Sequence, residues 1–208
     1  QGMSAELDAQ IKRACESGDY AAAATLFIEH HGGEILAFLG ARLRNPSSAE
    51  EVFAIFAEKL WIGLPSFEWR STLRSWAYRL ARNAANDYVQ AAAHRPGRHV
   101  PLSDNAMLSN LIDRVRTTTA AYRRTPVKDR MRELREMLPE DDQMLLILRV
   151  DREMDFRELA VAMANGETLL TDADLDREAA RLRKRFERIK ERLRELAEEA
   201  GLIKPRRD

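Results

Sequence analysis

The order of hydrophobic and polar residues predicts helices along almost the whole chain. Apolar residues recur three and four positions apart, as in Leu7 and Ile11 or in Leu73, Ala77 and Leu80. No segment alternates between apolar and polar positions over any length, which is the pattern of a half-buried strand. The pattern therefore predicts an all-α protein.

Breaks in this pattern divide the first half of the chain into four helical segments. We expect helices over residues 5–18, 20–44, 48–61 and 71–92. Gly18-Asp19 ends the first helix, and Gly32-Gly33 predicts a bend or an interruption in the second. Asn45-Pro46-Ser47-Ser48 is expected to form a turn, and Ser47 or Ser48 can cap the third helix.

A change of composition separates a second helical module from the first. The segment 94–127 contains several prolines and one amphipathic piece near 105–116, and it predicts a linker that carries a short helix. A helix from Val127 to Leu138 follows, then one opened by Asp141 or Asp142 in which Val150 is expected to be buried. A short helix near 155–164 and a long one near 175–199 complete the chain. The organisation is therefore two small helical modules, 1–93 and 128–208, joined by the linker 94–127.

The charge of the chain is balanced in total but uneven along its length. The 208 residues include 34 basic and 34 acidic side chains, and charged residues make up 33%. Residues 1–60 carry a net charge of −4, whereas residues 70–98 and 177–196 each carry +5. Two basic segments predict two contact surfaces for a polyanion. The alternative is that these arginine-rich helices are simply solvated faces.

Several classes of protein are excluded by residue types. The single cysteine, Cys15, cannot form an internal disulfide, which favours a reducing compartment such as the cytoplasm. The four histidines, His30, His31, His94 and His99, have no zinc-binding spacing. No apolar run approaches the length of a transmembrane helix. We find no nucleophile–base pair, glycine-rich phosphate loop or metal cluster, so we expect no enzyme, no cofactor, no metal and no membrane contact.

Motifs in both halves resemble the sigma factors of bacterial RNA polymerase. Ser48-Ala49-Glu50-Glu51-Val52-Phe53, with Leu60-Trp61 after it, resembles a helix of sigma region 2. The run from Leu73 to Asn83, together with Asp87, resembles the promoter-melting helix of that region. Leu138-Pro139-Glu140, Phe156-Arg157-Glu158-Leu159-Ala160 and the basic stretch that contains Arg185 resemble the helix-turn-helix of region 4. Their order and spacing are similar to the extracytoplasmic-function (group IV, ECF) type of the sigma-70 family.

The resemblance implies an alternative sigma factor that directs RNA polymerase to specific promoters and initiates transcription. Its partners would be core RNA polymerase and promoter DNA, with an anti-sigma factor or a Ser/Thr kinase as regulator. Residues 1–93 would bind polymerase and the −10 element, and residues 128–208 would bind the −35 element. The alternative is a helix-turn-helix DNA-binding regulator that does not dock on polymerase.

Capture of a melted strand requires aromatic faces for stacking and cations for phosphates. The candidates for the −10 element are Trp69, Arg70, Arg74, Tyr78, Arg79, Arg82, Asn83 and Asp87. Trp76 shares a helix face with Leu80, which favours a place in the core, whereas Trp69 is expected to be exposed in or beside a loop. By resemblance, the loop 62–72 would form a pocket for a flipped base.

Recognition of the −35 element requires a helix whose cations reach bases and phosphates in the major groove. The candidates are Arg181, Arg183, Lys184, Arg185 and Arg188. The connection from Asn165 to Asp174 is longer than the usual turn of this motif, which leaves open which of them read bases. Its acidic residues would repel phosphate, so we expect this connection to point away from DNA.

By resemblance, the helix over 48–61 docks on a coiled coil of polymerase. The docking candidates are Glu50, Glu51, Ala54, Ile55 and Glu58. Ala54 and Ile55 stand where the family usually has Gln and an acid, and Ser48 stands where it usually has Asp. Burial of Ile55 in the core is an equal alternative. Because a phosphate adds about −1.5 to −2 charges, phosphorylation could restore the missing negative surface. The candidate sites are Ser47, Ser48, Ser71 and Thr72.

Overall fold

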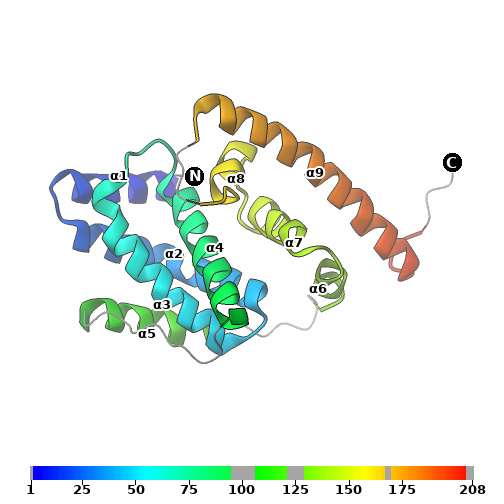
Figure 1. Cartoon of the computed structure of the whole chain (residues 1–208), viewed down its shortest axis with the longest axis horizontal. Coiled ribbons are helices and arrows are strands. Elements are labelled where there is room, and N and C mark those ends of the chain that lie inside the picture. The colour runs from blue at the N-terminus through cyan, green and yellow to red at the C-terminus, as the bar shows by residue number, and fades with distance from the viewer. Residues whose placement is uncertain (1, 95–105, 121–128, 167–169, 205–208) are drawn as a thin grey trace. The chain divides into compact units, whose positions relative to one another are not determined.

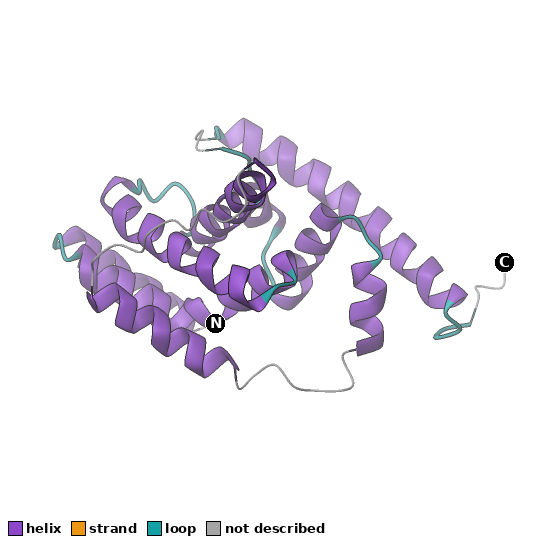
Figure 2. Ribbon diagram, turned by 60° about the horizontal axis from the view of Figure 1, so that its bottom comes forward, coloured by secondary structure: helices purple, strands orange, loops and turns teal. Residues whose placement is uncertain are grey.

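The computed structural model of the chain describes residues 2–94, 106–120, 129–166 and 170–204. Within these ranges every regular element is a helix, which confirms the all-α prediction (Figure 2). The chain divides into two compact units, Gln1–Arg123 and Arg124–Asp208. Parts of the expected linker, residues 95–105 and 121–128, lie outside the described residues, and so does the expected helix start at Val127.

The first unit is built around one long helix. Its elements are α1 (Gly2–Glu16), α2 (Tyr20–Leu43), α3 (Pro46–Gly63), η1 (Leu64–Ser66), α4 (Leu73–His94) and α5 (Ala106–Ala120). The central helix is α2, which packs against α1, α3, α4 and α5 (Figure 1). Five large aromatic side chains are fully buried in this core, namely Phe27, Phe38, Phe53, Phe56 and Tyr78.

The start of α3 differs from the expected one. Asn45 is the N-cap, and its side-chain oxygen accepts a hydrogen bond from the backbone N–H of Ser48 at 3.0 Å. The expectation that Ser47 or Ser48 caps this helix is therefore wrong. Pro46 occupies the first helical position, where its missing N–H has no cost and its fixed φ fits the helix.

The glycine pair in α2 does not break the helix, because α2 runs without interruption from Tyr20 to Leu43. A Cβ atom on Gly32 would lie 3.0 Å from Val115 Cγ2 of α5 and 3.3 Å from Phe53 Cζ of α3. The missing side chain therefore lets two helices approach α2 closely. Gly32 therefore serves close packing of the helices.

The amphipathic piece of the expected linker forms α5, which packs on α2 and α3. Its apolar stripe is buried, with Leu108, Leu111, Ile112 and Val115 facing inward. At its edge Arg114 forms an ion pair with Glu29 of α2 at 3.0 Å. Burial of four aliphatic side chains gives this helix a place in the first unit.

The second unit consists of three shorter helices, a π-helical turn and one long helix. They are α6 (Asp129–Glu136), α7 (Glu140–Leu146), η3 (Ile147–Asp151), α8 (Phe156–Ala162) and α9 (Asp172–Glu199). The long helix α9 contacts each of α6, α7 and α8 (Figure 1). The expectation that Val150 is buried is wrong, because 48% of it is exposed. It lies two residues after the buried Leu148 and so faces the opposite side of the turn.

Both helices of the expected helix-turn-helix begin with a capping box. The Asp155 side chain accepts hydrogen bonds from backbone N–H groups at the start of α8, and the Glu158 carboxylate accepts one from the Asp155 N–H. Thr171 and Asp174 form the same arrangement at the start of α9. Because of this cap, α9 begins at Asp172, three residues before the expected start.

Candidate nucleic-acid interface

Three aromatic side chains gather in the first unit where the loop after η1 enters α4. The Phe67 ring lies 5.0 Å from the Trp69 ring and 4.9 Å from the Trp76 ring, measured between centroids. All three residues are half-buried, so Trp76 is not enclosed in the core and Trp69 is not fully exposed. We call Phe67, Trp69 and Trp76 the aromatic loop cluster. It offers partly exposed ring faces of the kind that stack on bases.

The backbone is shaped to hold this cluster. Trp69 has φ +57°, in the left-handed region that a bulky side chain rarely adopts. Gly63 lies against Trp76, because a Cβ at Gly63 would meet Trp76 Cη2 at 3.0 Å. Such strained and close-packed positions persist only where the surroundings impose them, and they are frequent at binding sites.

Cations stand near the cluster. Lys12 of α1 places its ammonium 5.7 Å from the Trp69 ring centroid, which is within cation–π range. Arg70 is exposed beside Trp69. Sequence reasoning missed Lys12, because a separation of more than fifty residues leaves no pattern that links it to Trp69. Arg70 is thus an exposed member of the −10 candidate set, and the half-buried Trp69 lies beside it.

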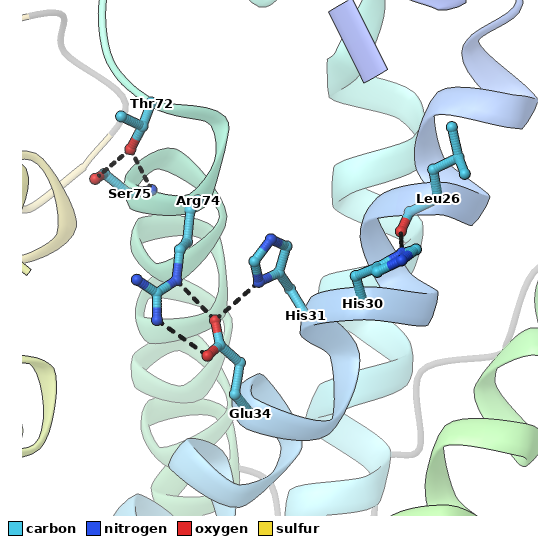
Figure 3. A network of polar contacts seen from close by, with 7 residues as sticks. All are labelled: Leu26, His30, His31, Glu34, Thr72, Arg74 and Ser75. Carbon is cyan, nitrogen blue, oxygen red and sulfur yellow. Dashed lines mark hydrogen bonds and ion pairs between the residues drawn. The ribbon is translucent and has the colours of Figure 1, made fainter. Parts of the chain in front are cut away.

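Arg74 is held by an acidic partner from α2 (Figure 3). Its Nε and Nη2 donate to the two oxygens of Glu34 at 2.8 and 3.0 Å, and His31 Nδ1 lies 3.1 Å from Glu34 Oε1. Burial by itself raises the pKa of the Glu34 carboxyl. Hydrogen bonds from His31 and Arg74, with their charges, outweigh it and lower that pKa to about 2. The network fixes Arg74 and ties α4 to α2.

Three candidates for strand contact face the interior. Tyr78 is 0% exposed and packs edge-on against Phe38 with centroids 5.1 Å apart. Arg79 and Arg82 are each 6% exposed. A buried ring offers no face to a base, and a buried guanidinium does not reach a phosphate. The structure therefore assigns these three residues to packing within the first unit.

The remaining −10 candidates lie further along α4. Asn83 is half-buried, whereas Asp87 is exposed and forms an ion pair with Lys59 of α3 at 3.1 Å. This pair joins α4 to α3 at the surface. Exposed pairs of this kind contribute little stability and leave the carboxylate reachable from solvent.

The docking candidates on α3 fall into two groups. Ala54 is buried at 4% exposure and belongs to the core. Ile55 and Glu58 are half-buried, and Ile62 is 69% exposed. Residues 55, 58 and 62 are three and four positions apart, so they share one face of the helix. That face combines an exposed apolar side chain with a carboxylate.

The acidic pair of α3 is already engaged within the first unit. The Tyr88 hydroxyl donates to Glu51 Oε2 at 2.9 Å and lies 3.4 Å from the Ser48 hydroxyl. Arg116 of α5 donates to the Glu50 carbonyl oxygen at 3.0 Å. Of the phosphorylation candidates, Ser47 and Thr72 are exposed, and Ser48 and Ser71 are half-buried.

The basic residues of α9 divide by their partners. Arg185 is half-buried and pairs with Asp142 of α7 at 2.5 Å, so it secures the packing of the second unit. Arg181 lies 3.5 Å from Glu178 on its own helix. Arg183, Lys184 and Arg188 are exposed. These three and Arg181 form the accessible part of the −35 candidate set.

The acidic start of α9 is tied to α8. Arg157 forms ion pairs with Asp172 and with Asp176, the second at 2.8 Å. These ion pairs compensate the charge of Arg157 and connect the first turns of α9 to the start of α8. The basic stretch therefore begins in the second turn of the helix and beyond.

The described residues contain neither a cluster of metal ligands nor a membrane-spanning helix. Among them, no group of His, Cys, Asp and Glu side chains is arranged as metal ligands would be. Each helix in the described ranges is too short or too polar to span a bilayer. Cys15 is buried and free, and burial raises the pKa of its thiol.

Comparison with known proteins assigns part of the first unit. A search of curated proteins found no match, and neither did a search of solved structures. Residues 27–95 match the family model described as Sigma-70 region 2. The matched segment covers most of α2, α3 and α4, and it includes the aromatic loop cluster and the acidic pair of α3. Residues 27–95 of the first unit are therefore similar to sigma-70 region 2.

Proposed function

We propose that this chain is an alternative sigma factor of the extracytoplasmic-function (group IV) type. It binds core RNA polymerase, directs it to specific promoters and initiates transcription without catalysis of its own. The match of residues 27–95 to sigma-70 region 2 carries the proposal. The aromatic loop cluster supports it, because partly exposed rings beside cations suit a melted DNA strand. The work takes place in the cytoplasm, where polymerase and promoter DNA are found.

Each of the two units has its own role in the proposed function. In the first unit, the face of α3 with Ile55, Glu58 and Ile62 docks on polymerase, and the aromatic loop cluster captures the −10 element. In the second, α8 and α9 form a helix-turn-helix that meets the −35 element through the exposed basic residues of α9. Cations on one helix face supply the phosphate contacts that hold such a helix in a groove.

Titration of core RNA polymerase with the full-length protein, read by fluorescence anisotropy, tests the docking step. We expect binding, and we expect Ile62→Ser to weaken it because this exposed apolar side chain would be covered by the partner. Ile203→Ser, which changes an exposed apolar residue after α9, is the matched control and should bind like the parent. Equal affinity of all three proteins would count against docking through this face.

Binding of single-stranded DNA tests the melting step. Trp69→Ala should weaken the affinity for a mixed-sequence single strand by roughly tenfold, since one base–aromatic stack is worth about 1–3 kcal/mol. Trp61→Ala, at the end of α3 and outside the cluster, should bind like the parent. If the parent and Trp69→Ala bind duplex DNA equally well and neither binds single strands, the result would support the alternative, a helix-turn-helix regulator.

One observation favours that alternative, a helix-turn-helix regulator that does not dock on polymerase. Ala54 is buried, the Tyr88 hydroxyl donates to the Glu51 carboxylate, and Arg116 Nε lies 3.9 Å from the Glu50 carboxylate. The acidic surface that would meet a partner is thereby reduced. Failure of the unmodified protein to bind polymerase while it still binds duplex DNA would support this reading.

Phosphorylation by a Ser/Thr kinase would restore negative charge at this surface. Ser47 suits it best, because it is exposed in the first turn of α3, where a phosphate is favoured by the helix dipole. A phosphate on Ser48 would stand beside the Glu51 carboxylate, where like charges repel. Ser71 and Thr72 precede α4, and the Thr72 hydroxyl already hydrogen-bonds Ser75 at 2.7 Å. An anti-sigma factor is the other regulator we propose.

Phosphomimetic variants test this regulation. Ser47→Asp should raise the affinity for core polymerase more than Ser48→Asp does, whereas Ser17→Asp, an exposed site after α1, should leave it unchanged. No gain for Asp at Ser47, Ser48, Ser71 or Thr72 would refute control by phosphorylation. Control by an anti-sigma factor would then remain.

A further inference from the structure

A pocket of about 470 Å³ lies in the second unit where η3, α8 and α9 meet. Phe156, the first residue of α8, forms part of its wall. Arg149 of η3 and Arg183 of α9 also line the pocket. The pocket is therefore built by three segments that are far apart in sequence and carries two guanidinium groups.

Both guanidinium groups lie against the same aromatic ring. The Arg149 and Arg183 Cζ atoms are each 5.0 Å from the Phe156 ring centroid. This distance is within the range of a cation–π contact, so the ring attracts both cations. The two Cζ atoms are consequently no further apart than twice that distance, although like charges repel. Phe156 therefore contacts both guanidinium groups.

The other charged side chains of the lining, Asp155, Arg157 and Asp176, have partners of their own. Arg157 is paired with Asp172 and Asp176. The Asp155 carboxylate accepts two backbone N–H groups, those of Arg157 and Glu158, each at 2.8 Å. Arg149 and Arg183 form no ion pair with an acidic side chain among the residues that the structure describes. The lining holds three guanidinium groups and two carboxylates, a formal net charge of +1, and Arg149 and Arg183 are the two cations in it that remain available to an anion.

The chain around Arg149 is folded to bring it to the ring. The π-helical turn Ile147–Asp151 is followed by Glu153 at φ +55°, and the Met154 N–H donates to the Leu148 carbonyl at 3.1 Å. Arg149 Nη1 then donates to the Met154 carbonyl at 2.7 Å. On the other side, Phe186 of α9 packs on Phe156 with centroids 6.0 Å apart. Both the cation and the ring are thus held in place.

We propose that Arg149 and Arg183 form an anion clamp for phosphodiester groups, and that Phe156 is the positioning residue that holds the two arginines together. Two guanidinium groups that are already oriented lose little freedom when they bind a phosphate oxygen. The proposal rests on the DNA-binding role of the second unit, and it adds Arg149 and Phe156, which the basic stretch of α9 does not contain. Inorganic phosphate carries the same chemistry and is the other source of ligand.

Duplex DNA binding by the full-length protein, measured over a range of salt concentrations, tests the clamp. Arg183→Gln should lower the slope of log affinity against log salt by about 0.9, the value for one lost phosphate contact. Arg149→Gln should lower it equally. Phe156→Leu should weaken binding by about tenfold, as expected when two cation–π contacts are lost, while Phe156→Tyr should restore it.

Two controls separate positioning from folding. Arg192→Gln removes a cation of α9 that is paired with Glu195 and Glu199, and it should bind DNA like the parent. The thermal unfolding midpoint of each variant reports whether the second unit is intact. Loss of binding by Phe156→Leu with an unchanged midpoint, and recovery by Phe156→Tyr, supports the clamp. Parental affinity and salt slope in Arg149→Gln, Arg183→Gln and Phe156→Leu overturn it.

A separate arm distinguishes failure of the clamp from failure of the proposed function. If the unmodified protein binds no duplex DNA, the DNA-binding role of this unit is wrong. Inorganic phosphate is then titrated and followed by chemical shifts of the arginine side chains. Shifts that disappear in Arg183→Gln retain an anion clamp for small phosphates, and no shifts in the unmodified protein overturn the clamp as well.

Discussion

Replacement of Glu34 by Gln should destabilise the first unit in a pH-dependent manner. Glu34 accepts two hydrogen bonds from Arg74 at 2.8 and 3.0 Å and interacts with His31 (Figure 3). The variant keeps the size of the side chain but removes its charge, so Arg74 loses its counter-ion. The pKa of the carboxyl lies at about 2 in the folded chain against 4.5 for an unperturbed group. That difference corresponds to about 3 kcal/mol.

The direction of the pH effect follows from this depressed pKa. Between pH 4.5 and pH 2 the unfolded chain takes up a proton at Glu34 while the folded chain does not. The stabilisation by Glu34 is therefore complete above about pH 4.5 and is lost as the pH falls towards 2. The free-energy difference between the parent and Glu34→Gln should be largest at pH 7 and should shrink across this window.

Urea unfolding followed by circular dichroism measures the difference. With a slope of about 2 kcal/mol per molar urea, a loss of about 3 kcal/mol lowers the midpoint by roughly 1.5 M at pH 7. The double variant Glu34→Gln with Arg74→Gln should be less destabilised than the sum of the single variants, because the two groups act as a pair. A difference that stays constant from pH 7 to pH 3, or additive single variants, would refute the role given to this network.

Three further sets of variants test helix packing, a helix cap and a buried-edge hydrogen bond. Gly32→Ala should destabilise the first unit by about 1 kcal/mol because its new methyl group meets Val115, and it should become stabilising in a Val115→Ala background. Gly40→Ala meets nothing within 4 Å and should stabilise α2 by about 0.5–1 kcal/mol. Urea unfolding measures the stability of all three variants. Asp155→Ala should cost the second unit about 1 kcal/mol while Asp155→Asn keeps the cap, and their thermal unfolding midpoints should differ accordingly. Tyr88→Phe removes a hydroxyl that donates to an acidic side chain of α3 and should cost about 1 kcal/mol in urea unfolding; no change would mean that water replaces the bond.

Local features of the chain were readable from the sequence. The boundary at Gly18-Asp19 and the long helix near the C-terminus follow from helical periodicity and from turn residues. A break near Asn45 was also predicted, but the turn expected over residues 45–48 is wrong, because α3 already begins at Pro46. The detailed start of a helix was less accessible. Asn45, not Ser47 or Ser48, caps α3, because several neighbouring residues can serve and only the backbone geometry selects one.

The composition of the candidate interface was visible in the sequence, but its accessibility was not. Helical spacing places Arg74, Tyr78 and Arg82 on neighbouring positions of α4, and residue type marks them as suitable for a DNA strand. The structure buries Tyr78 and Arg82 and pairs Arg74 with Glu34. Which part of a helix surface is covered depends on the helices that pack against it, and these come from distant parts of the chain.

The sequence by itself determined the helical character, the approximate breaks between helices, and the presence of aromatic and basic side chains in two regions. Only the tertiary structure decided which of these side chains meet. Lys12 reaches Trp69 from α1, and Arg149 and Arg183 converge on Phe156 from two elements. The physical reason is that periodicity encodes contacts three or four residues apart, whereas contacts across tens of residues arise from the packing of whole helices.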